Sequence, residues 1–365
     1  MKKLVIIGAN DFQNQLILKA KALGYETHVF AWEEGAVGKS SADFFYPISI
    51  TEKERILKKC QEIKPDGICS IASDLACITV NYVAESLGLP CNKYAYSKMQ
   101  TNKYLMRQAL QKAGLACPKF IIADNKFNDS MLNCFRFPII VKPTDRSGSR
   151  CITKLENVKG LKDAINQAID VSFEKKAIIE EYIDGDEYSM ETITQNGIHN
   201  YLATTKKFTT GAPHFIESGH RQPSGLTENL ISKAKKVIYE ALDALHIENS
   251  AGHSEFKIDS NGNVSIIEIG ARMGGDCIGS DLVYLSTGND FMKMVIDVAV
   301  GNEIEILSNN INNTVEIHFL FTQDDLNKLK NISSNRIYRI SNIDFDNLGK
   351  TKDSSSRLGY YIELC

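Results

Sequence analysis

The sequence has neither an excess of charge of one sign nor a long hydrophobic run. Its 42 Lys and Arg residues almost balance 45 Asp and Glu residues, leaving a net charge of −3 at pH 7, so we expect no nucleic-acid partner. No apolar stretch approaches the roughly 20 residues that span a bilayer, so we expect no membrane association. The chain also starts without a long apolar signal segment. Together these absences predict a cytoplasmic protein.

Regular cysteine spacing and common phosphate-binding signatures are missing as well. The nine cysteines form no Cys-x-x-Cys pair, which is typical of reduced, mostly buried thiols. Gly8 follows the first apolar strand, but no further glycines complete a dinucleotide fingerprint. The loop 145–150 lacks the Gly-Lys-Ser/Thr of a Walker A sequence. We therefore expect Gly8 to serve a strand-to-helix turn rather than a bound pyrophosphate.

Alternating strand and helix patterns occupy the first part of the 365-residue chain. Short β-branched strands are predicted over 3–8, 26–30 and 67–70, and amphipathic helices over 13–23, 51–62 and 74–87. This order predicts a Rossmann-like domain with a parallel sheet over residues 1–97. Ser73 and Asp74 follow a strand end, where a small ligand is expected, although N-capping of the next helix alone explains both residues.

One further helix is predicted from Ser97 to Ala113, and Gly114 ends it. Lys103 and Arg107 are spaced i, i+4, so they share a face of that helix. From spacing alone, we expect this face to be solvated.

The middle of the chain changes to antiparallel patterns. Strands over 137–143, 177–183 and 187–194 are bounded by turn-forming pairs such as Asp184-Gly185 and Asn196-Gly197, which predicts an α+β region. Lys142 ends the first strand beside the loop 147–149, which could hold phosphate oxygens or be a plain hairpin turn.

Two pairs of titratable residues in this region are candidates for ligand contacts. Glu181 and Glu187 flank one turn, where they could accept ribose hydroxyls or be exposed. Glu217 and His220 lie in a polar, glycine-bearing stretch. They could bind a substrate ammonium or assist a proton transfer, or they could lie in a loop with incidental charge.

The stretch from 253 to 276 carries the most informative pattern. Asn261-Gly262 predicts a two-residue turn between strands 254–259 and 264–269, which places Glu255 directly opposite Glu268. Two carboxylates whose Cβ atoms lie about 4.5–5.5 Å apart repel each other, and a divalent cation such as Mg²⁺ would offset that cost. The alternative is a slipped register with both glutamates solvated. The core face is expected to carry Phe256, Ile258, Ile267 and Ile269.

The loop after the second strand favours the metal interpretation. Gly274 and Gly275 expose backbone N–H groups, and Arg272 offers a planar set of donors, so the loop can bind an anion. A metal pair beside an anion site indicates phosphoryl chemistry.

Together, these motifs resemble those of the ATP-grasp superfamily over residues 1 to about 300. In chain order they are Lys103, Val141-Lys142-Pro143, Ser147-Gly148-Ser149, Glu180-Glu181-Tyr182-Ile183 with Glu187, Glu255, and Glu268-Ile269-Gly270-Ala271-Arg272. Each motif is weak alone, and the order and spacing make the set specific. Glu217, His220 and the loop 270–275 resemble the carboxylate–amine ligases, especially the L-amino-acid (dipeptide) ligase branch.

The resemblance implies an α/β and α+β fold that starts with a Rossmann-like (pre-ATP-grasp) domain over residues 1–97. An ATP-grasp domain would follow over 98–300, with a lid subdomain over about 115–190 and a catalytic subdomain over about 190–300. The remainder, 301–365, is expected to be a small β-rich appendage that shapes the substrate pocket or a homodimer contact.

Roles for individual residues are implied in the same way. ATP would be held by Lys103, Lys142, Ser147, Gly148, Ser149, Glu180, Glu181, Tyr182, Ile183 and Glu187. Glu255 and Glu268 would bind Mg²⁺, with Mn²⁺ as a substitute. Arg272 would bind the substrate carboxylate and then the acyl phosphate, helped by the Gly274 and Gly275 amides. Glu217 and His220 would line the amino-substrate pocket, and catalysis would depend on Arg272, Lys142 and His220.

One position departs from the family pattern. Many members carry an asparagine metal ligand two residues after the second glutamate, and here that position is Gly270. Gly270 cannot supply a side-chain oxygen, so a water, a backbone carbonyl or another ligand must.

The implied activity is an ADP-forming ligase that joins a small carboxylic acid, such as an amino acid, to an amine through an acyl phosphate. A rival with the same fold would make carboxyphosphate from bicarbonate. A rival from another class is a non-catalytic nucleotide-binding sensor. The presence of Arg272 with both glutamates and both lysines favours an enzyme over a sensor.

Overall fold

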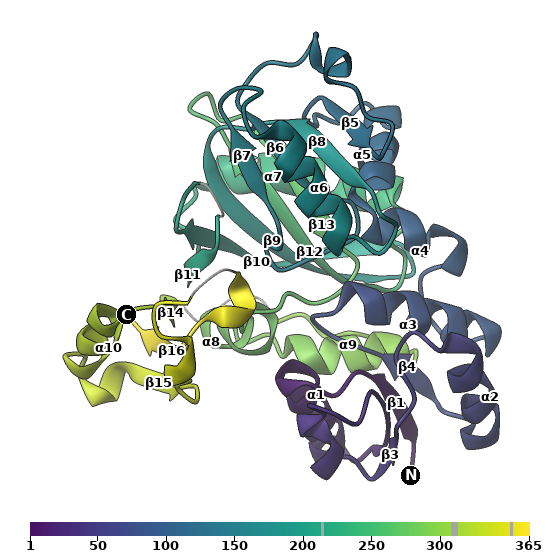
Figure 1. Cartoon of the computed structure of the whole chain (residues 1–365). Coiled ribbons are helices and arrows are strands. Elements are labelled where there is room, and N and C mark those ends of the chain that lie inside the picture. The colour runs from purple at the N-terminus through teal and green to yellow at the C-terminus, as the bar shows by residue number, and fades with distance from the viewer. Residues whose placement is uncertain (213–214, 308–312, 351–352) are drawn as a thin grey trace.

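The computed structural model describes residues 1–365 outside the segments 213–214, 308–312 and 351–352. The described residues form three sheets, and Figure 1 shows the large one between the N-terminal sheet and a small sheet covered by a helix. In this part of the chain, no helix combines the length and the apolar character needed to cross a membrane.

The N-terminal sheet is parallel, with the strand order β3-β2-β1-β4. Its elements are β1 (Lys3–Ile7), α1 (Asp11–Ala22), β2 (Glu26–Phe30), β3 (Phe44–Tyr46), α2 (Lys53–Ile63), β4 (Gly67–Cys69) and α3 (Asp74–Ser86). Gly8 has a φ of 101° between β1 and α1, as a strand-to-helix turn requires. Asn10 and Gln13 then form a capping box at the start of α1. The predicted parallel sheet is confirmed.

The predicted single helix over 97–113 is wrong, because two helices, α4 (Tyr94–Thr101) and α5 (Lys103–Lys112), meet at Asn102. Asn102 is extended, with φ −108° and ψ 116°, and its side chain accepts from the N–H groups of Tyr104 and Leu105. The Lys103 N–H is released from helical bonding and donates to the Thr144 carbonyl at 2.7 Å. This break turns Lys103 and Arg107 inward, where both are buried, rather than toward solvent as predicted.

The small sheet has the order β5-β8-β6-β7. Its elements are β5 (Phe120–Ala123), β6 (Ile139–Pro143), β7 (Thr153–Leu155), α6 (Leu161–Val171) and β8 (Ala177–Glu181). Ile139, Val141 and Ile179 point to one face and pack with Leu161, Ala168 and their neighbours on α6. The opposite face of β6 carries Lys142, so packing of α6 on one side directs this lysine to the other.

The large sheet has the order β13-β12-β9-β10-β11-β14-β16-β15. Its strands are β9 (Asp186–Gln195), β10 (Ile198–Thr209), β11 (Glu217–Gln222), β12 (Ser250–Ile258), β13 (Val264–Gly270), β14 (Val315–Leu320), β15 (Ile337–Ile340) and β16 (Gly359–Leu364). The helices connected to it are α7 (Glu228–Ala244), α8 (Val283–Thr287), α9 (Phe291–Ala299) and α10 (Gln323–Lys330).

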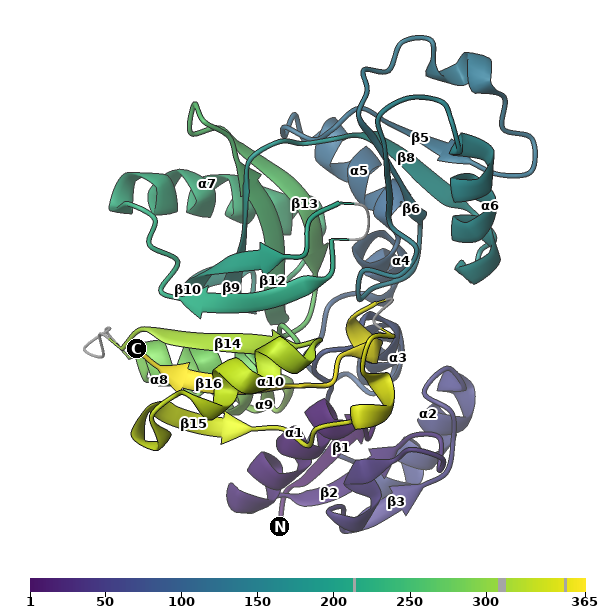
Figure 2. The ribbon, with the colours of Figure 1, turned by 60° about the vertical axis from the view of Figure 1, so that its left-hand side comes forward.

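Two features of this sheet differ from a simple reading of the sequence. Glu217 and His220 lie on β11 rather than in a loop. The C-terminal strands extend the sheet, because β14 pairs with β11 and β16 pairs with β14, and Figure 2 shows β14, β16 and β15 one after another.

The β12–β13 hairpin confirms that Glu255 and Glu268 lie opposite each other, but its turn and its strand pairing differ from the predicted ones. Ile258 pairs with Val264, and Gly262 N–H donates to the Asp259 carbonyl, so the turn is one residue longer than two. A bulge at Ile267 then restores the register, and Glu255 pairs with Glu268. Ile267 was expected in the core, but the bulge turns it into the cleft described below. Phe256, Ile258 and Ile269 are buried as predicted.

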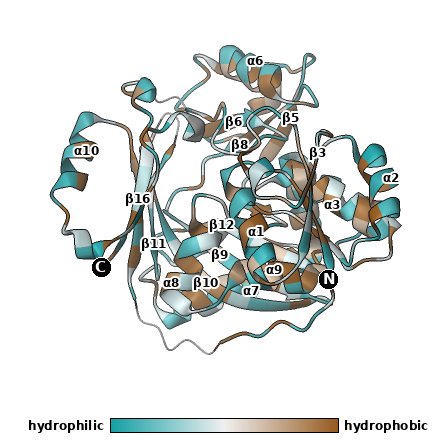
Figure 3. Ribbon diagram, turned by 90° about the horizontal axis from the view of Figure 1, so that it is seen from below, coloured by the Kyte–Doolittle hydropathy of each residue, from teal (hydrophilic) through white to brown (hydrophobic). Residues whose placement is uncertain are grey.

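Helix α9 joins the N-terminal sheet to the large sheet. Its buried Phe291, Met294 and Val295 belong to the same apolar cluster as Leu4 and Ile193, and Figure 3 shows this brown, hydrophobic helix beside α1 and the large sheet. In contrast, α10 is mostly hydrophilic in Figure 3 and lies at one edge of the molecule. The core at α9 therefore fixes the N-terminal sheet against the strands that carry the site.

Candidate active site

A cleft lies between the small sheet and the large sheet. It gathers most of the residues selected from the sequence. Those that line it are Lys103, Lys142, Ser147, Gly148, Ser149, Glu180, Glu181, Tyr182, Ile183, Glu187, Glu217, Glu255, Glu268 and Arg272. His220 and Gly275 line an adjoining cavity, and Gly274 lines neither.

The opposed carboxylates of the hairpin are each paired with a lysine. Lys103 Nζ lies 2.7 Å from Glu268 Oε1 and donates to the Arg146 carbonyl at 2.7 Å. Lys207 Nζ donates to Glu255 Oε1. Two carboxylates on adjacent strands, next to lysines on other elements, form a donor set that fits a divalent cation bound to phosphate oxygens.

Lys142 lies in a buried triad of charges. Glu180 Oε2 is 2.7 Å from Lys142 Nζ, and Glu180 Oε1 is 2.6 Å from Arg107 Nε. Burial acts to raise the pKa of Glu180, but Arg107 and Lys142 outweigh it and lower that pKa to about 2. Burial lowers the pKa of Lys142, and Glu180 opposes this shift. The Glu180 side chain, expected at the adenine hinge, therefore holds the two cations in place.

The rest of the expected hinge, Glu181 to Ile183, follows β8 at the edge of the cleft. Glu181 accepts from the backbone N–H of Arg136 at 2.9 Å, which turns its carboxylate toward the surface. Lys257, which the sequence did not suggest, donates to the Ile183 carbonyl at 3.2 Å and lies 4.5 Å from the centre of the Tyr182 ring. A cationic residue and an aromatic ring thus border this end of the cleft.

Lys207 is a buried residue that the sequence analysis did not select. Besides Glu255, its Nζ atom is 3.4 Å from Glu187 Oε1 and 3.7 Å from Glu217 Oε1. Burial opposes its charge, but Glu255, Glu187 and Glu217 raise its pKa well above the ordinary value. The place of Lys207 on β10, which brings it next to Glu255, could have identified this residue as part of the site. That step required knowing that β10 pairs with β9.

His253 is a second residue that was missed. Its Nδ1 is 2.6 Å from Glu191 Oε1, and its Nε2 is 3.3 Å from Glu255 Oε1. Although burial acts to lower the pKa of His253, Glu191 and Glu255 raise it to about 9. His253 is therefore protonated at neutral pH. Gly274 packs against His253 and Glu191, since a Cβ at position 274 would lie 2.8 Å from His253 Nδ1. The lack of a side chain at Gly274 therefore makes room for His253.

Arg272 reaches across to the N-terminal sheet. Its Nε and Nη2 donate to Asp74 Oδ1 and Oδ2 at 2.9 and 3.3 Å. Burial acts to raise the pKa of Asp74, but Arg272 lowers it below the ordinary value. A Cβ on Gly270 would lie 3.2 Å from both Asp74 Oδ1 and the Arg272 guanidinium carbon. Gly270 therefore makes room for this ion pair at the position where an asparagine was expected from the family pattern.

The adjoining cavity lies directly beside the cleft. It shares with the cleft a wall made of Ser147, Gly148, Arg150, Glu217, His253, Glu255 and Arg272. Buried His220 lies in this cavity with Nε2 3.8 Å from Asp276 Oδ2. Burial lowers the pKa of His220 and Asp276 opposes the shift, so the neutral imidazole is favoured. The C-terminal residues Ser354, Arg357 and Tyr360 close the far side.

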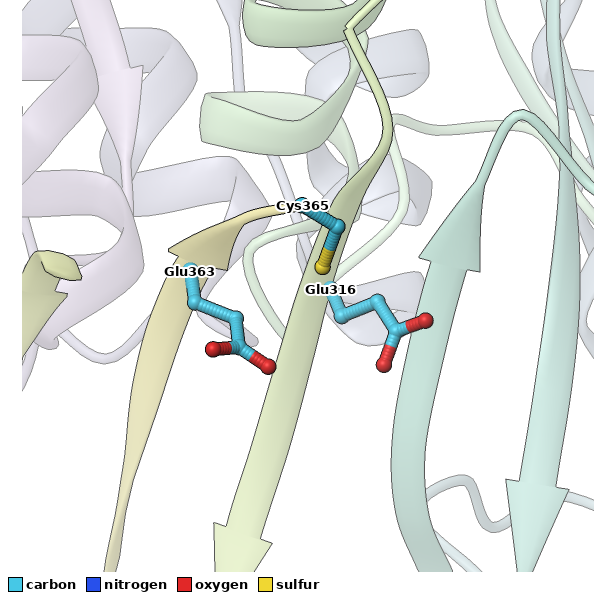
Figure 4. Close-up of side chains that lie close together, drawn as sticks. All are labelled: Glu316, Glu363 and Cys365. Atoms are coloured by element: carbon cyan, nitrogen blue, oxygen red, sulfur yellow. The ribbon is translucent and has the colours of Figure 1, made fainter. Parts of the chain in front are cut away.

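A second acidic group lies outside the cleft, on β14 and β16 (Figure 4). Glu316 pairs with Glu363 across the strands, and possible ligand atoms of these residues and Cys365 lie within 4.8 Å of one another. His318 Nε2 is 3.2 Å from both carboxylates. Arg336 Nη2, which is 3.5 Å from Glu363 Oε2, supplies a charge of opposite sign to this group.

Comparison with known proteins supports the assignment of the fold. Residues 135–281 match the family model of the ATP-grasp domain. Alanine–anticapsin ligase of Bacillus subtilis is 28% identical over 277 residues, which cover 65% of this chain and 57% of that protein. The large chain of carbamoyl phosphate synthase from Thermotoga neapolitana is 23% identical over 344 residues, 85% of this chain and 30% of that protein.

Among solved structures, an L-amino acid ligase from Bacillus licheniformis superposes with a TM-score of 0.79 at 22% identity, covering 100% of this chain and 93% of that one. The two curated relatives are longer, and the matches span less than two thirds of each. The order of motifs, the family match and the superposition agree. Residues 135–281 are therefore similar to the ATP-grasp domain, and the whole chain shares the fold of this ligase structure.

Proposed function

We propose that the protein is an ATP-dependent, ADP-forming carboxylate–amine ligase that acts on an amino acid or a similar small carboxylic acid. The observation that carries this proposal is the wall shared by the cleft and the adjoining cavity, which includes Glu255 and Arg272. A nucleotide in the cleft and an acceptor in the cavity would face each other across it. Direct transfer between two bound substrates needs this arrangement.

Within this proposal the lysines and glutamates divide the charge of Mg-ATP. Lys103, Lys142 and Lys207 hold phosphate oxygens, and Glu255 and Glu268 hold Mg²⁺. Mg²⁺ held by these glutamates would supply positive charge next to the transferred phosphoryl group. Glu255 and Glu268, which pair with Lys207 and Lys103 in this structure, would then contact Mg²⁺ as well. The lysines would contact phosphate oxygens, so each buried charge would have a partner of opposite sign. The backbone of Glu181 to Ile183 takes the adenine, and Glu187 takes the ribose.

The chemistry proceeds in two steps. A carboxylate oxygen attacks the γ-phosphorus of ATP, ADP leaves, and an acyl phosphate remains. The amine nitrogen then attacks the acyl carbon, the C–O bond to phosphate breaks, and an amide forms. Arg272 neutralises the carboxylate and the acyl phosphate, neutral His220 accepts the proton that the amine gives up, and the loop 147–149 excludes water.

The names of similar proteins support the choice of substrates. The names alanine–anticapsin ligase and L-amino acid ligase each include an amino acid among the ligated substrates. A solved biotin carboxylase domain of similar fold is described in complex with ADP and bicarbonate, so bicarbonate is the second candidate substrate for phosphoryl transfer.

The test is ADP release from Mg-ATP by the full chain, across single amino acids, amino-acid pairs and bicarbonate. Release that needs a carboxylate and an amine together is expected, and hydroxylamine should trap the acyl phosphate as a hydroxamate. Glu268→Gln should abolish release, whereas Glu240→Gln, an exposed change on α7, should not. Release with bicarbonate alone would replace the ligase by the carboxylase, and ATP binding without release from any mixture would favour the sensor.

A further inference from the structure

The C-terminal segment 353–360 brings an arginine into the adjoining cavity. Arg357 Nη1 donates to Asp276 Oδ2 at 2.9 Å, and its Nη2 donates to Glu217 Oε2 at 3.2 Å. The guanidinium carbon lies 3.6 Å from the centre of the Phe319 ring, and only 8% of the side chain is exposed. One arginine thus joins two carboxylates from separate elements, β11 and the loop after β13.

Glu217 is also held from other directions. Ser354 Oγ donates to its Oε2 at 2.8 Å, and Ser149 Oγ of the phosphate loop donates to its Oε1 at 3.2 Å. The C-terminal segment and the loop that would cover ATP therefore meet at one carboxylate. This contact fixes the Glu217 side chain between the two substrate regions.

The local charge suits a cation. Asp276 and Glu217 carry two negative charges, Arg357 carries one positive charge, and His220 is neutral, so one negative charge remains. Lys207 lies 3.7 Å from Glu217 and also contacts Glu187 and Glu255, whereas His253 and Arg272 on the shared wall pair with Glu191 and Asp74. Two buried nitrogen atoms in this cavity have no hydrogen-bond partner within the described part of the chain: His220 Nδ1, which in the neutral imidazole can accept from an ammonium N–H, and Arg357 Nε, whose N–H needs an acceptor on the ligand. Buried polar atoms of this kind are usually satisfied, which indicates that a polar ligand completes the site.

We infer that Asp276 and Glu217 together bind the ammonium group of the amine substrate, and that Arg357 is a positioning residue that holds both carboxylates toward it. This inference rests on the proposed function and extends it, because it assigns Asp276 to the substrate and gives the C-terminal region a role in the second step. The substrate that supplies the nucleophile of the second step is thus a protonated primary amine. The bound ammonium gives one proton to neutral His220 and so becomes the nucleophilic amine, and the second proton leaves with the phosphate released from the acyl phosphate.

The test separates the two steps of the reaction in the full chain. Arg357→Ala, Arg357→Lys and Asp276→Asn are compared with Arg336→Ala, a control on the exposed side of the same C-terminal region. Hydroxylamine is uncharged at neutral pH, so hydroxamate formation should stay within about twofold in every variant. With the amine substrate, KM should rise roughly 10- to 100-fold in Arg357→Ala and Asp276→Asn, which is the effect of losing one hydrogen bond to a charged group. Arg357→Lys should recover part of the loss.

Two results would overturn the inference. One is an equal loss of hydroxamate and amide in Arg357→Ala, which would place the arginine in folding or in phosphoryl transfer. The other is an unchanged KM for the amine in Asp276→Asn.

A binding measurement does not depend on turnover and separates this inference from the proposed function. Calorimetry with a non-hydrolysable ATP analogue and a panel of amino-acid amides, which carry an ammonium but no carboxylate, should show binding to the wild type. Asp276→Asn should weaken it roughly 10-fold or more. Binding that is equal in both proteins would disprove the ammonium site. If the ammonium binds but the wild type releases no ADP with any carboxylate, only the ligase proposal fails.

Discussion

Replacing Glu180 by glutamine should destabilise the protein more than most single changes. The carboxylate accepts from Arg107 at 2.6 Å and from Lys142 at 2.7 Å, and its side chain is only 5% exposed. Glutamine has nearly the same shape but no charge. Two buried cations would then face each other without an anion, which is the most costly way to break a buried ion network.

The magnitude follows from the pKa of Glu180, which falls from an ordinary value of 4.5 to about 2 in the folded protein. Because each pKa unit corresponds to about 1.4 kcal/mol, ionisation of Glu180 contributes about 3 kcal/mol at pH 7. Breaking a buried pair costs about 3–5 kcal/mol in general, so the two figures agree. The contribution is present above pH 4.5 and is lost as the pH falls toward 2, because the folded-state pKa is the lower one.

The assay is urea denaturation followed by far-UV circular dichroism at several pH values. Glu181→Gln is the matched control, because the adjacent carboxylate pairs with Arg136, whose side chain is 89% exposed. This control should lose less than about 1 kcal/mol. The double variant Glu180→Gln with Lys142→Met should recover part of the stability, since one of the two unpaired cations is removed. Equal losses for Glu180→Gln and Glu181→Gln at pH 7 would refute the reasoning.

Three further predictions follow from contacts in the site. Gly274→Ala should lower the free energy of unfolding by about 1–3 kcal/mol, because the new Cβ would lie 2.8 Å from His253 and 2.9 Å from Glu191. Gly275→Ala is the control and should change the stability little, because its new Cβ would have its nearest neighbour at 3.6 Å. Equal urea midpoints for the two variants would contradict this prediction. Lys207→Met should reduce ADP release roughly 100-fold, which is the loss seen when a group that stabilises developing charge is removed. The adjacent change Lys206→Met should not reduce ADP release, because it breaks only a pair with Asp186, whose side chain is 70% exposed. The pKa of His253 is raised to about 9, so its contribution to stability is complete below pH 6.5 and is lost as the pH rises through 9; thermal unfolding between pH 6 and 10 should show this slope in the wild type but not in His253→Gln.

Local patterns allowed much of the backbone to be predicted. β1 and β2, the cap at Ser73 and the antiparallel strands after Asp184 all depend on residues a few positions apart, and each was found where expected. The opposed Glu255 and Glu268 were also predicted, although the longer turn and the bulge at Ile267 compensated for each other. The helix over 97–113 failed because the bond from Lys103 N–H to Thr144 lies outside any local window.

The sequence by itself determined the fold class, the order of the motifs and the residue types that can hold a metal–phosphate group, because periodicity and turn chemistry act over short separations. Tertiary structure alone decided which charges meet. Arg272 and Asp74 are separated by 198 positions and Arg357 and Glu217 by 140, and nothing in local spacing couples them. These pairs form because the α9 core and the continuous large sheet bring three parts of the chain to one cavity, where buried charges need partners of opposite sign.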